Sequence, residues 1–306
     1  MRTAFALILV SILGSPPASA QLAVRLDPRG TVAEVKVGDA VYLSDVAVSL
    51  VKPGWTGNLA DQRNVDPGTV HVYKAGATTT YTMPLSGGSF TGQLIERVTR
   101  RDDAVELQYE VIPDRDVEIE TVLLRGSLAT AMHAGKTSYL VGGPDVARGV
   151  FPVDLNAEKY ILWGGEPAWL GFAAPQGGGL RVVPHDMGLQ LQDDRKWNNP
   201  SFAMLATAGG GEHLMRKPIR FGLSLRAEAP GRLEDELKQG ATVGVRLKDD
   251  RPLAVKAARI DRDRIGVFST VTVDADVQAR YDNPFDPDEI AVDGEVATPD
   301  GKQVTV

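Results

Sequence analysis

The sequence predicts an all-β protein built from large antiparallel sheets, and three observations support this fold class. Apolar and polar residues alternate at 33–37 and 105–111, which is the two-residue period of a strand with one buried face. Runs of strand character at 117–128 and 219–227 exceed the usual strand length of about five or six residues and favour wide sheets. Glycine- and aspartate-rich turns separate these runs.

One helix is expected, at 231–239. Glu234 lies in its first turn, where a negative charge is favourable, and Gly240 can end it. New strand-like runs follow this helix. We therefore expect a β domain at 21–251 and a second group of strands at 252–306.

The second group holds about fifty residues, whereas an immunoglobulin-like sandwich needs about 100. Its last residues, 303–306, have the pattern of a strand that continues beyond Val306. We therefore expect this section to be an incomplete sandwich and the chain to be a fragment. The alternative is that these strands extend the sheets of the first domain.

The first twenty residues predict export. Arg2 provides a positive charge, an apolar run follows at 4–13, and Ala18-Ser19-Ala20 is a small-x-small cleavage site before Gln21. The apolar run ends after about ten residues, which is too short for a membrane-spanning helix of about twenty. The pattern predicts a signal peptide at 1–20 and a secreted or periplasmic mature protein that is not held in the membrane.

Composition excludes several classes of partner. The chain has 0 cysteines, so neither a disulfide framework nor a lipid-modified cysteine is possible. Its net charge is −7 and its basic residues are interleaved with acidic ones, which excludes nucleic-acid binding and disfavours anionic membrane surfaces. Neutral partners fit better, and the oligomeric state stays open.

Known catalytic and metal-binding patterns are missing. The 4 histidines are widely spaced, without the convergent ligands that zinc requires, and no G-x-S-x-G nucleophile motif occurs. An acidic cluster at 282–289 lacks the spacing of a calcium loop, and its prolines favour a rigid turn. We expect neither a metal nor a cofactor, and the sequence leaves the catalytic residues unknown.

Aromatic residues near polar ones are the best candidates for a binding site. Sugar rings stack on flat aromatic side chains, while their hydroxyls bond to carboxylate, amide and cationic groups. The alternative is that these tryptophans fill the core and that the carboxylates are solvated turn residues. The candidates for carbohydrate binding are Trp55, Trp163, Glu166, Trp169, Asp193, Lys196 and Trp197.

Two segments resemble known families. The stretch 281–292 (YDNPFDPDEIAV), followed by a Thr298-Pro-Asp-Gly-Lys turn, resembles an immunoglobulin-like module of unknown function that precedes the catalytic barrel of predicted secreted glycoside hydrolases. Residues 21–251 resemble, by length and architecture, the two-sheet supersandwich domains of the galactose-mutarotase-like group. The stretch 189–202 and the turn 163–166 are its local similarities.

These resemblances imply a function. They imply that the chain is the N-terminal, non-catalytic and glycan-binding portion of an exported carbohydrate-active enzyme, with a polysaccharide or oligosaccharide as partner. The alternatives are a self-contained mutarotase-like sugar epimerase and a structural or adhesion module without a ligand. The histidines of the mutarotase-like enzymes have no matched positions in this chain, which puts catalysis by this domain in doubt.

Overall fold

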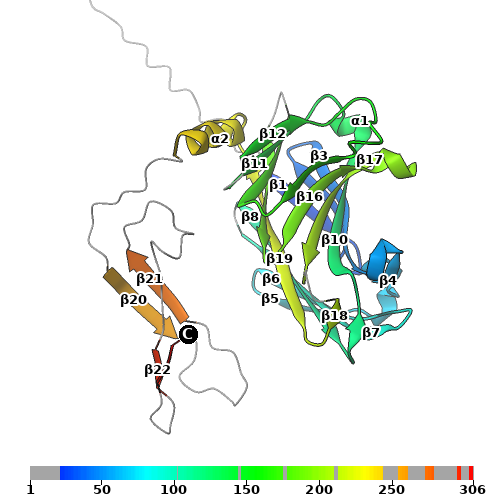
Figure 1. Ribbon diagram of the computed structural model, residues 1–306, viewed down its shortest axis with the longest axis vertical. Coiled ribbons are helices and arrows are strands. Elements are labelled where there is room, and N and C mark those ends of the chain that lie inside the picture. The colour runs from blue at the N-terminus through cyan, green and yellow to red at the C-terminus, as the bar shows by residue number, and fades with distance from the viewer. Residues whose placement is uncertain are drawn as a thin grey trace, which may run out of the picture. The chain divides into compact units, whose positions relative to one another are not determined.

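Figure 1 shows a computed structural model of the chain. The structure describes residues 21–101, 103–143, 146–174, 178–209 and 213–243, together with strands at 254–260, 273–278, 295–297 and 303–305. Two compact units are present, Met1–Lys238 and Gln239–Val306. The predicted signal peptide at 1–20 and the acidic motif at 281–292 lie outside the described residues. Within the described part of the chain, no helix is long and apolar enough to cross a bilayer.

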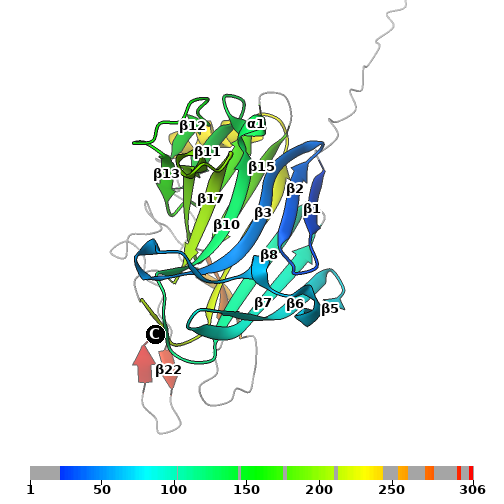
Figure 2. The same ribbon diagram turned by 90° about the vertical axis from the view of Figure 1, so that its right-hand side faces the viewer.

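The first sheet of the first unit has eight strands in the order β1-β2-β3-β10-β17-β16-β13, with β4 also paired to β3. Neighbouring strands are antiparallel, and Figure 2 shows β2, β3, β10 and β17 side by side. The strands are β1 (Leu22–Leu26), β2 (Val32–Val37), β3 (Ala40–Val51), β4 (Asn58–Asp61), β10 (Thr121–Ala129), β13 (Ile161–Gly165), β16 (Gly188–Asp193) and β17 (Ser201–Ala208).

The second sheet has nine strands in the order β12-β11-β14-β15-β19-β8-β7-β6-β5, and its neighbours are antiparallel as well. These strands are β5 (His71–Ala75), β6 (Thr78–Gly87), β7 (Phe90–Arg100), β8 (Ala104–Pro113), β11 (Ser138–Gly142), β12 (Ala147–Val150), β14 (Trp169–Ala173), β15 (Gly179–His185) and β19 (Ile219–Glu228). The predicted all-β fold with two large antiparallel sheets is therefore confirmed.

The core lies between the two sheets. Alternation along β10 and β17 turns Leu124 and Met204 inward, where both are fully buried, and β8 and β19 supply Leu107 and Leu225 from the other sheet. All four belong to one continuous cluster of buried side chains. A domain without disulfides depends on a core of this kind for its stability.

The predicted strand at 117–128 is wrong in one respect, because it is two strands. β9 (Val117–Glu118) pairs with β18 (Leu214–Met215), and β10 belongs to the eight-stranded sheet. At the break, the N–H of Ile119 donates to the carbonyl of His213 at 2.7 Å, and that of Glu120 donates to Val51 at 2.8 Å. The amides of Ile119 and Glu120 thus bond to different parts of the fold, which the continuous strand pattern of 117–128 did not indicate.

The helix predicted at 231–239 is confirmed as α2 (Arg232–Val243), but the prediction that Gly240 ends it is wrong, because the helix continues through Gly240 to Val243. Leu233 is 1% exposed and packs against Leu140 and Trp169. The other helical segments of the first unit are short: α1 (Thr130–His133) and the 3₁₀ turns η1 (Pro53–Trp55), η2 (Gln62–Asn64), η3 (Pro67–Thr69) and η4 (Asp194–Trp197).

In the second unit the described residues form two hairpin pairs. β20 (Ala254–Ile260) pairs with β21 (Val273–Gln278), and β22 (Glu295–Ala297) pairs with β23 (Gln303–Thr305), both antiparallel. Each lies within one of the strand runs expected at 252–306. Whether they belong to an immunoglobulin-like sandwich stays a prediction.

Candidate functional site

A groove of about 860 Å³ lies on the outer face of the eight-stranded sheet. The two-residue period of the strands creates its floor. Leu124 of β10 points into the core, so Leu123 and Arg125 point outward, and Leu205 and Thr207 of β17 do the same. The floor is therefore made of side chains that point away from the core between the sheets, and its two leucines pack with Val51 and Ala203 in a small buried cluster of their own.

Pairing registers place these side chains in rows across the strands. Arg125 lies opposite Leu205, Leu205 opposite Gln190, and Gln190 opposite Gly164 of the edge strand β13. The next row holds Thr207. Gly164 has no side chain, and a Cβ there would lie 3.9 Å from Gln190 Oε1. The glycine therefore leaves the glutamine amide open to the groove.

A chain of hydrogen bonds runs along the floor. Gln190 Nε2 donates to Gln192 Oε1 at 2.9 Å, and Gln192 Nε2 donates to Asp194 Oδ1 at 2.7 Å. The Asp194 side chain is buried, and its other oxygen is ion-paired with Arg125. A buried carboxylate requires this compensation. The charge of Arg125 is thus neutralised inside the floor.

Exposed aromatic side chains border the groove. Trp55 and Trp197 are each 54% exposed, although large aromatic side chains are usually buried. Tyr160 meets Trp197 edge to face, with ring centroids 5.1 Å apart, and Lys196 Nζ lies 3.5 Å from the Tyr160 ring centroid. Flat apolar faces beside a polar floor form a surface that suits an amphipathic ring.

Both tryptophans are carried by turns that contain a left-handed residue. Trp55 has φ of 58°, and the preceding Gly54 N–H donates to Glu120 Oε2 at 2.6 Å. Asn198, which follows Trp197, has φ of 60°. Left-handed backbone costs a bulky residue such as Trp55 about 1–2 kcal/mol, so the Trp55 turn is held in place by its surroundings, whereas asparagine adopts this conformation readily at the end of a helical turn.

Glu166 is the only carboxylate among the described residues that line the groove. It is exposed, and it forms no hydrogen bond or ion pair with any residue that the structure describes. A Cβ added at Gly188 would lie 4.0 Å from Glu166 Cγ, which places the carboxylate stem at that end of β16.

The seven predicted site residues divide into two groups. Trp55, Glu166 and Trp197 line the groove, and Lys196 stands beside it over the Tyr160 ring. The others have structural surroundings. They are Trp163, half-buried against the core, Trp169, buried on the nine-stranded sheet under Arg181, and Asp193, buried in an ion pair with Arg195 at 2.6 Å.

Sequence reasoning missed Arg125, Gln190, Gln192 and Thr207 as parts of the groove. All four occupy outward positions of alternating strands. The same pattern marks any solvated strand face, so no signal in the sequence separated them from ordinary surface residues.

A smaller hollow of about 260 Å³ lies on the outer face of the nine-stranded sheet. His185 Nε2 is 2.8 Å from Ser224 Oγ. His185 of β15 lies opposite Gly222 of β19, and Ser224 is two residues further along β19. Glu110 also lines this hollow, with Arg220 Nη2 at 2.6 Å. The hollow thus brings together a histidine and a carboxylate that is already bound by arginine.

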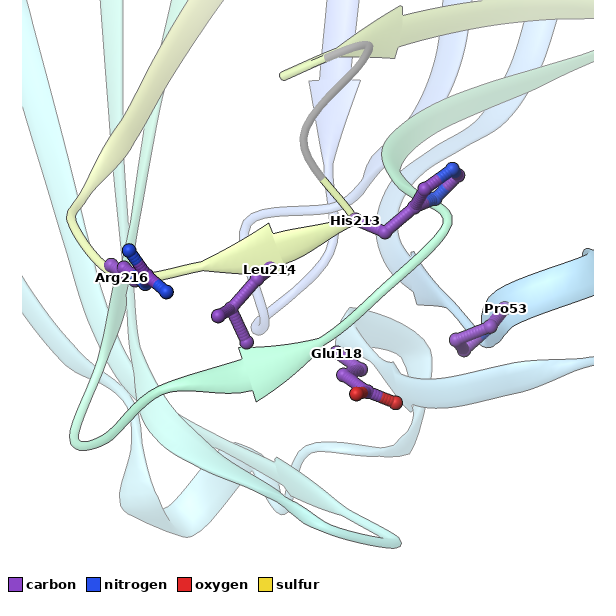
Figure 3. A pocket seen from close by; sticks show the side chains of 5 residues that line it. All are labelled: Pro53, Glu118, His213, Leu214 and Arg216. Carbon is purple, nitrogen blue, oxygen red and sulfur yellow. The ribbon is translucent and has the colours of Figure 1, made fainter.

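A third hollow of about 520 Å³ is drawn in Figure 3. Glu118 and His213 lie on the side that faces Pro53, and Arg216 lies at the opposite end of β18. These polar groups do not converge on one point. Across the described residues, no group of three or more histidine, aspartate or glutamate side chains is arranged to hold a metal ion.

Glu96 and His133 are buried titratable groups that line none of these hollows. Burial raises the pKa of Glu96 to about 8, although a hydrogen bond from Gln62 Nε2 at 2.9 Å favours the charged form. Burial likewise lowers the pKa of His133 to about 4, and neither ring nitrogen has a hydrogen-bond partner in the described part of the chain. These groups bear on stability rather than on a site.

No family model and no curated protein matches the sequence. Similar solved structures include a galactose mutarotase-like protein from Lactobacillus casei, at 13% identity and a TM-score of 0.47, over 70% of this chain and 98% of that one. A 4-alpha-glucanotransferase from Thermococcus litoralis is 10% identical with a TM-score of 0.44, over 68% of this chain and 37% of that one. An alpha-N-acetylgalactosaminidase from Bifidobacterium bifidum is 11% identical with a TM-score of 0.45, over 72% of this chain and 37% of that one. The chain therefore spans little more than a third of the latter two. Likenesses of this strength establish neither a family nor an activity.

Proposed function

We propose that the groove binds an oligosaccharide or polysaccharide, and that the chain is the non-catalytic, glycan-binding N-terminal portion of an exported carbohydrate-active enzyme. One observation carries the proposal: Trp55 and Trp197, each more than half exposed, line one groove together with leucine side chains and the amide and hydroxyl groups of Gln190, Gln192 and Thr207. A sugar ring presents C–H faces that stack on such aromatics, and hydroxyls that replace water on the polar floor.

The carboxylates of the groove favour binding over hydrolysis. Glycoside hydrolysis uses two carboxyl groups, about 5–9.5 Å apart, one as acid and the other as base or nucleophile. Glu166 alone lines the groove within the described residues, and nearby Asp194 is occupied by Arg125 and Gln192. A single free carboxylate can orient a sugar but cannot supply both roles.

The test is calorimetric titration of the exported chain with a panel of neutral glucose, galactose and mannose oligosaccharides of both anomeric linkages. Trp197→Ala and Trp55→Ala should each weaken binding about tenfold, because each removes a stacking surface worth about 1–1.5 kcal/mol. Tyr73→Ala is the matched control, since Tyr73 is 70% exposed on β5, outside the groove. Absence of binding to the whole panel, or an equal loss with Tyr73→Ala, would favour a structural or adhesion module.

A second candidate function, sugar epimerisation, is favoured by one observation: His185 and Glu110 both line the smaller hollow. Proton transfer at a sugar ring needs one acid and one base within hydrogen-bond reach. Polarimetry of freshly dissolved aldoses tests this directly. A rate enhancement that is lost in His185→Ala and kept in Trp197→Ala would support epimerisation over binding.

A further inference from the structure

The orientation of the floor amides follows from the charge of Asp194. Its carboxylate, ion-paired with Arg125, can only accept hydrogen bonds. Gln192 must therefore turn its NH₂ group toward Asp194 and its oxygen toward Gln190. Gln190 must then turn its NH₂ group toward Gln192, which leaves Gln190 Oε1 as the group that faces the groove.

A second acceptor lies at the same end. Gln190 and Gly188 are two residues apart on one face of β16, and the Glu166 stem lies beside Gly188. The carboxylate of Glu166 has no partner among the described residues. This end of the groove therefore presents an amide oxygen and an uncompensated negative charge.

The cations lie elsewhere. Lys196 is placed over the Tyr160 ring near Trp197, beyond the far end of β16, and Arg125 is neutralised by Asp194. Gly188 and Gln192 mark a separation of about 13 Å along the strand, at about 3.3 Å per residue. That distance exceeds the Debye length of about 8 Å at physiological salt, so the positive charge of Lys196 offsets the negative charge of Glu166 only weakly.

We infer that the Glu166 end of the groove selects a sugar unit that carries a free, protonated amino group, and disfavours one that carries a carboxylate or a sulfate. The inference rests on the proposed function and assigns its ligand class: glycans that contain unacetylated amino sugars. An ammonium group donates three hydrogen bonds and accepts none, which matches an end of the groove that holds a carboxylate, an amide oxygen and the Thr207 hydroxyl, which can also accept.

The experiment compares matched ligands on the full chain. β-1,4-linked glucosamine oligomers, β-1,4-linked glucose oligomers of equal length and oligomers of glucuronic acid are titrated by calorimetry at low and at physiological salt. We expect the glucosamine oligomer to bind about fivefold more tightly than the glucose oligomer, because an added ion pair at a partly exposed site raises the affinity by about that factor. Glu166→Gln should equalise the two affinities, and Glu166→Lys should shift the preference to the glucuronate oligomer.

Asp39→Asn is the matched control, because it removes the same charge from an exposed turn outside the groove. It should leave the preference for amine unchanged. Equal binding of glucose and glucosamine oligomers by the wild type, or an amine preference that survives Glu166→Gln, overturns this inference and leaves carbohydrate binding intact. If none of these oligomers and no member of the neutral panel binds, both this inference and the proposed function fail.

Discussion

Replacing Glu96 by glutamine should remove a pH dependence from the stability of the first unit. Glu96 is fully buried on β7, and burial raises its pKa from 4.5 to about 8. Between these values the folded state holds a proton that the unfolded state has released. Stability is therefore fully present below the unfolded pKa and falls as pH rises toward the folded one.

The magnitude follows from the cited pKa values. One proton of difference changes the free energy of unfolding by about 1.4 kcal/mol per pH unit. His133 has the opposite effect, because its pKa is lowered from 6.5 to about 4, so its contribution is lost as pH falls through that range. Between pH 4.5 and 6.5 the two slopes oppose each other. From pH 6.5 to 8 Glu96 acts alone, and the wild type should lose about 2 kcal/mol.

Urea unfolding followed by tryptophan fluorescence measures this loss. All 4 tryptophans lie in the first unit, so the signal reports that unit alone. Glu96→Gln keeps the shape of a protonated carboxyl, and its free energy of unfolding should stay level where that of the wild type declines. Glu158→Gln, at an exposed position, should decline with the wild type. Parallel curves for Glu96→Gln and wild type from pH 6.5 to 8 would refute the reasoning.

Three further substitutions test the packing and the titration of these groups. Gly30→Ala should destabilise the first unit by about 2–4 kcal/mol, because φ is 83° and the new Cβ would lie 2.4 Å from Glu96 Oε2. Gly38→Ala, at φ 59° with open space around it, should cost only about 1–2 kcal/mol, and equal losses in urea unfolding would contradict the packing argument. His133→Phe should remove the opposing slope, so that stability declines with rising pH from 4.5 to 8; an unchanged profile in the same assay would show that His133 does not titrate as described.

The sequence predicted the strands better than it predicted the groove. The runs at 105–111 and 219–227 fall inside β8 and β19 because one-sided burial imposes the period that was read. The break at Ile119 was missed because adjacent amides bond to different sheets while both flanking segments stay apolar. Local pattern fixes which side of a strand is buried and carries less information about where a sheet ends.

The candidate residues were distinguished by their neighbours in the chain. Trp197 lies among aspartate, lysine and asparagine, and it is exposed beside the groove. Trp169 begins the run WLGFA, whose five residues are all buried in β14. Asp193 belongs to the same polar turn as Trp197, yet it is buried under Arg195, because the last residue of a strand turns inward or outward by register alone. The polarity of the segment therefore indicated a turn, but only the strand register decided whether each side chain in it is buried or exposed.

The two turns that carry tryptophan show why the groove persists. The Trp55 backbone is held left-handed while Glu120 accepts from the Gly54 N–H, and Asn198 is held left-handed while its N–H donates to the Arg195 carbonyl at 3.0 Å. Arg195 in turn bonds to the carbonyls of residues 152 and 153. Neither arrangement adds to the core, and each keeps a large apolar ring in water. At Trp55 the left-handed backbone costs about 1–2 kcal/mol, whereas asparagine adopts it readily at Asn198. A fold stabilised only by its core has no use for two such turns, whereas a surface that must meet a ring with its aromatic faces already placed does.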